Sequence, residues 1–95
     1  MIHVGSINGT GELVLEDGSL GKADYSIHVW LDEGSRLKSA DGKIEADDHA
    51  LVRAFSAGKA QLRLEAGGEI EIVIKPRRLM AGRADVLVRG PVPGF

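Results

Sequence analysis

The chain has 95 residues, a formal net charge of −2 and no cysteine. This length fits one domain with one modest core, and without cysteine the chain has neither a disulfide framework nor a thiolate metal site. No apolar run approaches the roughly 20 residues of a membrane helix, and the first residues lack the basic and apolar regions of a signal peptide. We therefore expect a soluble cytoplasmic protein that has no membrane partner.

The charges are distributed unevenly along the chain. Residues 1–48 carry four basic and ten acidic side chains, whereas residues 49–95 carry eight basic and four acidic ones. Such asymmetry can mark a half that binds anions. It can equally mark two faces that attract each other within one fold or between subunits, and this is the interpretation we favour.

The amino-terminal segment predicts strands of unequal strength. Residues 2–7 are a weak strand candidate, and the glycine-rich stretch 5–11 is better interpreted as a connection, because it lacks the Lys-Ser/Thr pair of a phosphate-binding loop. Leu13 and Leu15 then alternate with polar residues and predict a strand with one buried face.

The segment EDGS at residues 16–19 predicts a turn. The alternation on either side favours a loop of odd length over residues 17–19. In that register Leu13 lies opposite Ala23.

One seven-residue pattern occurs three times, as GKADYSI at 21–27, GKAQLRL at 58–64 and GRADVLV at 82–88. Its apolar residues share one parity and its polar residues the other, which is typical of a half-buried antiparallel strand. The small alanine suits the tapered rim of a closed sheet. We therefore interpret the pattern as three strands that enter one barrel or sandwich in the same way, rather than as three Gly-basic corners that converge on one anion.

Turn residues divide the rest of the chain. The segments DEGS at 32–35 and EAGG at 65–68 each predict a turn. The segment ADGK at 40–43 predicts a hairpin whose two-residue loop is Asp-Gly. In that hairpin Lys38 faces Glu45, and opposite charges directly across a strand pair favour the register.

Residues 47–57 predict a short helix, although a strand is also compatible with their pattern. Asp47 can cap the amino end and Gly58 can end the helix. Leu51 and Phe55 lie four residues apart, on one helical face.

The carboxyl-terminal third begins with a strand at 69–74, in which isoleucine occupies every second position. Residues 74–82 predict a loop, because Pro76 cannot donate to a strand ladder. The last residues, 91–95, contain two prolines and predict an extended tail, so residues 1–90 form the single β-rich domain.

These elements predict a mainly β protein: a single small antiparallel β-barrel or sandwich of about six to eight strands, with one short helix at 47–57. The connections are short, and turn signals separate the strands along the whole chain.

The carboxyl-terminal half contains a candidate anion-binding region. Phosphate contacts require clustered and mobile positive charge, although nucleic-acid binders on small barrels usually add exposed aromatic side chains, of which this chain has few. A solvated loop that offsets the acidic half explains the same residues. The candidate residues are Lys75, Arg77, Arg78, Arg83 and Arg89.

Trp30 and His28 form a candidate interface, because both belong to the polar face of their predicted strand. A lone outward tryptophan can cover a sheet edge, pack beneath a loop or anchor an interface. If Leu31 pairs with Leu37, Trp30 lies across from Lys38, and a cation–π contact is possible.

Catalytic and metal-binding chemistry find little support. Asp24, Ser26 and His28 supply the residue types of a catalytic triad, but strand neighbours two positions apart lie about 6.5–7 Å from each other, too far for the required hydrogen bonds. The stretch Asp47, Asp48 and His49, even with His3 or His28, lacks the ligand spacing of zinc or calcium sites. We expect no catalytic residue, metal or cofactor.

The sequence therefore favours a non-catalytic β-domain that acts as a protein-interaction or self-association module, with a protein partner or a homo-oligomer. Edge strands of a small sheet invite such pairing. The alternative is a module that binds nucleic acid or a phosphate ligand through the basic region 75–89.

Overall fold

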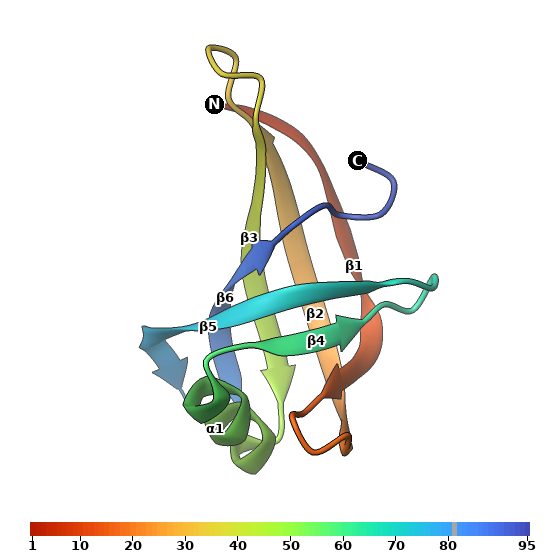
Figure 1. The fold of residues 1–95 in the computed structure, drawn as a ribbon, viewed down its shortest axis with the longest axis vertical. Helices are drawn as coiled ribbons and strands as arrows, with labels where there is room; N and C mark the ends of the chain where they lie inside the picture. Colours follow the sequence, from red (N-terminus) through yellow and green to blue (C-terminus); the bar gives the residue numbers. More distant parts are fainter. Residues whose placement is uncertain (81) are drawn as a thin grey trace.

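The computed structural model describes the backbone of residues 1–80 and 82–95 and the side chains of residues 1–75 and 82–95. Within these residues six strands form a closed antiparallel barrel in the order β1-β2-β3-β6-β5-β4 (Figure 1). The predicted mainly β class is confirmed, and the sheet is a barrel. Its elements are β1 (Ile2–Val14), β2 (Leu20–Leu31), β3 (Lys38–Ala46), α1 (Asp48–Ala57), β4 (Ala60–Arg63), β5 (Glu69–Met80) and β6 (Arg83–Arg89).

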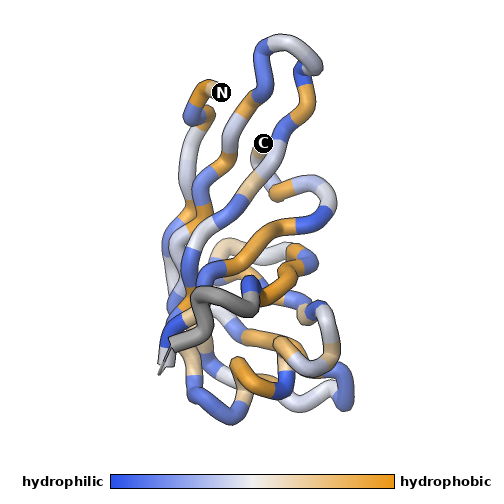
Figure 2. Tube along the Cα trace, turned by 90° about the vertical axis from the view of Figure 1, so that its left-hand side faces the viewer, coloured by the Kyte–Doolittle hydropathy of each residue, from blue (hydrophilic) through white to orange (hydrophobic). Residues whose placement is uncertain are grey.

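Alternating side chains build the barrel core. Along β2, Ala23, Tyr25, Ile27 and Val29 are buried, while the residues between them are exposed or half-buried. The same alternation of apolar and polar residues is visible along the strands in Figure 2. Because successive strand side chains point to opposite faces, the period of two in the sequence places the apolar set inside.

The three copies of the repeated pattern begin β2, β4 and β6 at the barrel end that α1 covers (Figure 1). Gly58 is the C-cap of α1, the Gly82 N–H donates to the Asp48 carboxylate, and a Cβ on Gly21 would lie 3.5 Å from that of Ala50. The small residues of the pattern therefore leave room for the helix at this rim. Their alanines, Ala23, Ala60 and Ala84, are all buried.

The helix predicted at 47–57 is confirmed, with the predicted caps. The Asp47 side chain accepts a hydrogen bond from the His49 N–H, and Gly58 adopts the left-handed conformation of a C-cap. Leu51 is fully buried, whereas Phe55 remains 39% exposed. The helix thus inserts only part of its apolar surface into the core.

The hairpin predicted at residues 40–43 is wrong, because β3 runs straight through it. Asp41 has strand neighbours on both sides, in β2 and in β6. A Cβ on Gly42 would lie 2.0 Å from the carbonyl oxygen of Ser26. Glycine is required there for the close approach of two strands and not for a turn, and the cross-strand pairs predicted from the hairpin are wrong for the same reason.

Two segments predicted to be irregular are strand. Residues 5–11, interpreted as a connection, lie inside β1. The loop predicted at 74–82 is also wrong, since β5 continues past Pro76. Proline interrupts the ladder, as the register with β6 shifts between Ile74 and Leu79, but its fixed φ is compatible with extended backbone.

The turn predicted at residues 16–19 is present, but its loop begins one residue earlier than predicted. The Leu15 N–H donates to the Ser19 carbonyl oxygen at 2.9 Å. Leu13 consequently lies opposite Gly21, two residues before its predicted partner. Turns are also present where they are predicted at 32–35 and 65–68.

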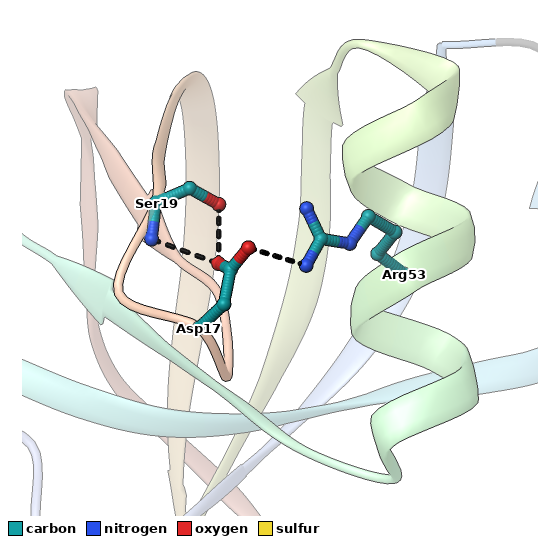
Figure 3. A network of polar contacts seen from close by, with 3 residues as sticks. All are labelled: Asp17, Ser19 and Arg53. Carbon is teal, nitrogen blue, oxygen red and sulfur yellow. Dashed lines mark hydrogen bonds and ion pairs between the residues drawn. The ribbon is translucent and has the colours of Figure 1, made fainter.

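A polar network ties this first turn to the helix (Figure 3). The Asp17 carboxylate accepts hydrogen bonds from the Ser19 hydroxyl at 2.6 Å and from the Ser19 N–H at 2.9 Å. It also accepts one from Arg53 of α1 at 2.7 Å. These donors, the Ser19 hydroxyl first, hold the pKa of Asp17 well below its usual range.

The carboxyl-terminal residues 91–95 fold back across the barrel end away from α1 (Figure 1). Val92 is buried, and the Phe95 N–H donates to its carbonyl oxygen at 3.0 Å, so the tail makes a turn. The ring of Phe95 occupies the space above Gly5, where a Cβ would lie 2.5 Å from the ring. Because Gly5 has no side chain, the Phe95 ring can pack against the backbone of β1 at this position.

Candidate functional site

The outer face of β1, β2 and β3 carries the predicted interface residues. Trp30 is half-buried there, between side chains from both neighbouring strands. The ring of His3 from β1 lies 5.0 Å from the Trp30 ring, measured between centroids. On the other side, Trp30 Nε1 donates to Asp41 Oδ1 of β3 at 3.1 Å. Contacts from two strands therefore hold the indole in one orientation.

His28 completes a group that we call the outer aromatic cluster, formed by His3, His28 and Trp30. His28 Nδ1 lies 3.3 Å from His3 Nε2, and the His28 ring lies 6.3 Å from that of Trp30. In neutral imidazole one ring nitrogen donates and the other accepts, so the two histidines share a hydrogen bond across β1 and β2.

The cation–π contact predicted between Trp30 and Lys38 is wrong. Trp30 pairs with Ser39, and Lys38 pairs with the next residue of β2. The prediction failed because it paired Leu31 with Leu37, whereas Leu31 pairs with Lys38. Sequence reasoning missed His3 and Asp41 as neighbours of the indole, because it placed Asp41 in a turn and assigned no partner to the weak strand candidate at 2–7.

Large apolar side chains are exposed at the same end of the molecule. Met1 is 79% and Leu37 70% exposed, and Ile2 and Val4 are 45% and 42% exposed. Ile2 pairs with Leu31 at the end of β2, and the chain amino terminus lies beside the turn between β2 and β3 (Figure 1). We call Met1, Ile2, Val4 and Leu37 the apolar tip. Grouped apolar side chains on a surface are typical of a contact site.

The structure does not bring the predicted anion-binding residues of β6 together. Arg83 and Arg89 lie at opposite ends of that strand, six residues and so about 20 Å apart. Each already faces a carboxylate: Arg83 Nε is 3.3 Å from Glu45 Oε1, and Arg89 Nε is 3.6 Å from Glu71 Oε2. Both guanidinium groups therefore have a partner on the neighbouring strand.

The other members of the predicted basic region lie on β5. Lys75 is half-buried and directly follows Ile74, the last residue before the ladder with β6 shifts. The side chains of Arg77 and Arg78 lie outside the described residues.

Ion pairs between the two halves of the chain account for part of the uneven charge distribution. In the described residues, acidic side chains from the first half meet basic side chains from the second half on adjacent elements. These pairs are Asp17–Arg53 at 2.7 Å, Glu45–Arg83 at 3.3 Å and Glu12–Arg63 at 3.7 Å. The attraction between halves that we favoured from the sequence operates within the fold.

The residues considered for catalysis have separate partners. Asp24 accepts a hydrogen bond from the Thr10 hydroxyl at 2.6 Å, while His28 contacts His3. Among the described residues, no group of three or more His, Cys, Asp and Glu side chains is placed to hold a metal ion. No helix in that part of the chain is both long and apolar enough to cross a membrane.

A hollow of about 300 Å³ lies where the carboxyl-terminal tail crosses the barrel. Lys38, Ser39 and Gly90 belong to its lining. The apolar lining consists of Val29, Ala40, Val88, Pro91, Val92 and Phe95.

No protein-family model, no curated protein and no solved structure matches this chain. A proposal for its function must therefore come from the geometry of its surfaces.

Proposed function

We propose that this protein is a non-catalytic self-association module, in which copies of the chain meet at the end that carries the apolar tip and the outer aromatic cluster. The observation that carries the proposal is the exposure of large apolar side chains beside a half-buried Trp30. Removing apolar surface from water stabilises a contact by roughly 25 cal/mol per Å². Tryptophan is among the residues most often found as interface anchors.

A second copy suits this surface because a twofold dimer covers the apolar tip of both copies at once. In such a dimer the same surface occurs on both subunits, so each tip is removed from water by the other copy. None of the four side chains of the tip is charged.

Binding of nucleic acid or a phosphate ligand has less support. Arg83 and Arg89 are already engaged by Glu45 and Glu71, and an anion would have to compete with these carboxylates. The aromatic side chain on the outer face, Trp30, lies on β2 and not beside the basic strand.

Sedimentation velocity over a range of protein concentrations tests the proposal. We expect a species of about twice the 10.1 kDa chain mass, whose fraction rises with concentration. Leu37→Asn and Trp30→Ala should weaken the association. Leu37 is 70% exposed, so its substitution should leave the fold intact.

The matched control is Val52→Asn, which removes an exposed apolar side chain from α1, at the other end of the barrel. It should not change the association. A monomer at every concentration would contradict self-association, and equal effects of Leu37→Asn and Val52→Asn would contradict the surface. Titration of labelled single-stranded DNA at low and physiological salt tests the alternative, since salt-sensitive binding would favour the basic region.

A further inference from the structure

The closed barrel leaves a backbone edge of β1 unpaired next to the apolar tip. β1 pairs with β2 from Ile2 to Val14, but with β4 only from Glu12 to Val14. Within the described chain, no backbone hydrogen bond joins residues 2–9 to any element other than β2. The backbone groups on the second edge of this segment therefore have no strand partner in the described chain.

The groups on this edge follow from the hydrogen bonds of the turn. Leu15 and Ser19 form a hydrogen-bonded pair, and such pairs alternate with non-bonded ones along an antiparallel ladder. Counting along the unbroken register, Ile7 directs its N–H and C=O toward β2, whereas Ser6 and Asn8 direct theirs away. Both Ser6 and Asn8 are exposed.

The edge also lacks the usual protection against pairing. Natural edge strands carry lysine, proline or inward charges that block a second strand. Residues 1–11 contain no Asp, Glu, Lys, Arg or Pro. A bulge does lie at Val4, where the register shifts between His3 and Gly5, but it precedes residues 5–9, whose register with β2 is unbroken.

We propose that β1 pairs antiparallel with β1 of a second copy, about a twofold axis at Ile7. Ser6 and Asn8 lie symmetrically around Ile7, so Ser6 of each copy meets Asn8 of the other and both sets of free backbone groups are satisfied at once. The inference rests on the proposed self-association and specifies its geometry. A second copy is favoured over another partner because two identical uncharged segments meet without like-charge repulsion.

The same register relates the edge to the apolar tip. We expect the ladder to end at Gly9, because the turn between β4 and β5 lies close to that residue: a Cβ on Gly9 would be 3.0 Å from the Glu65 carboxylate. Gly5 pairs with Gly9 of the other copy in this register, so the ladder covers residues 5–9. Because the two strands run antiparallel, the residues before Gly5, including those of the apolar tip, lie toward the turn between β4 and β5 of the other copy. The tip is thus covered in the dimer without taking part in the ladder.

Charge placed on the edge tests both the pairing and its register. In the double variant Ser6→Lys with Asn8→Lys, lysines face each other across the twofold axis, and we expect the dimer to weaken by about tenfold or more. In Ser6→Lys with Asn8→Glu, each lysine faces a glutamate, and the dimer should persist. Val52→Lys with Ser56→Lys adds the same charge on exposed positions of α1 and should leave the dimer unchanged.

Sedimentation velocity reads out these variants, and far-UV circular dichroism confirms that each is folded. If the Ser6→Lys with Asn8→Lys variant dimerises as strongly as the α1 control variant, the edge pairing is overturned while self-association stands. Equal weakening by the Lys–Lys and Lys–Glu variants overturns the register at Ile7. A monomeric wild type overturns both this inference and the proposed function.

Amide hydrogen exchange on the unmodified protein provides a test that needs no variant. The amides of Ser6 and Asn8 should exchange more slowly as the protein concentration rises, because dimerisation buries them in a ladder. The amide of Ile7 already bonds to β2 and should show a smaller change. Exchange at Ser6 and Asn8 that does not depend on concentration, in samples that sediment as dimers, overturns the pairing.

Discussion

Single side chains decide local geometry in this small barrel, and Asp17 is the clearest example. Its carboxylate collects donors from its own turn and from Arg53 of α1 (Figure 3). The contact joins the turn between β1 and β2 to the helix that covers the barrel end. Since the hydrogen bonds favour the charged form, they hold the pKa of Asp17 below its usual range.

Asp17→Asn should lower the thermal midpoint at neutral pH by a small amount, because both side chains of the ion pair are partly exposed. The lowered pKa means that the stabilisation is fully present above the unfolded-state pKa of about 4 and is lost as the pH falls toward the folded-state pKa. The difference in midpoint between wild type and variant should therefore shrink below about pH 4.

Thermal unfolding of both proteins from neutral to strongly acidic pH measures this difference. Ser19→Ala provides the comparison, since it removes one donor and should produce part of the same effect. A difference between wild type and Asp17→Asn that stays constant across the whole range would show that the carboxylate charge is not involved.

At the level of the strand, the close packing of Gly42 in β3 outweighs the preference of the Asp-Gly pair for a turn. Asp-Gly is a strong hairpin signal, yet Gly42 lies in the middle of β3, between strand neighbours from β2 and β6. A Cβ there would meet backbone of β2 at 2.0 Å. The close approach of two strands overrides the local preference for a turn.

Gly42→Ala should lower the free energy of unfolding by about 2–4 kcal/mol, because backbone must move to admit the new methyl group. Gly21→Ala is the matched control. A Cβ on Gly21 would make only ordinary contact, 3.5 Å from that of Ala50, and the change should stay within about 0.5 kcal/mol. Urea denaturation measures both, and equal effects of the two substitutions would contradict the close approach at Gly42.

At the scale of the whole molecule, the two ends of the barrel are closed by different means. The helix inserts Leu51 at one end, and the carboxyl-terminal tail places Val92 and Phe95 over the other. At one contact of the tail, the Phe95 ring lies where a side chain of Gly5 would be. The beginning and the end of the chain are thereby joined across the barrel.

Gly5→Val should displace Phe95 and lower the free energy of unfolding by about 1–3 kcal/mol. The Phe95→Ala variant should lose a similar contact. If the two residues act through each other, the effect of Gly5→Val should be clearly smaller in the Phe95→Ala background. A double-mutant cycle by urea denaturation measures the coupling, and strictly additive effects would contradict it.

The amino-acid sequence alone predicts the mainly β class, the inward face of the strands that carry the repeated pattern, and the helix with both its caps. These features depend on alternation and on capping residues close together in the chain, such as Asp47 and Gly58. The outward position of Trp30 and His28 is also predictable, because parity alone places both on the outer face.

The strand register, the closure of the barrel and the neighbours of Trp30 follow only from the three-dimensional packing. Register depends on contacts between distant segments: Gly42 against β2, and a bulge between His3 and Gly5 that lets His3 reach the indole. The alternation in the sequence is compatible with several registers that differ by two residues, because each keeps the same side chains inside. Packing between strands distinguishes them, and the open edge of β1 exists only once that packing is fixed.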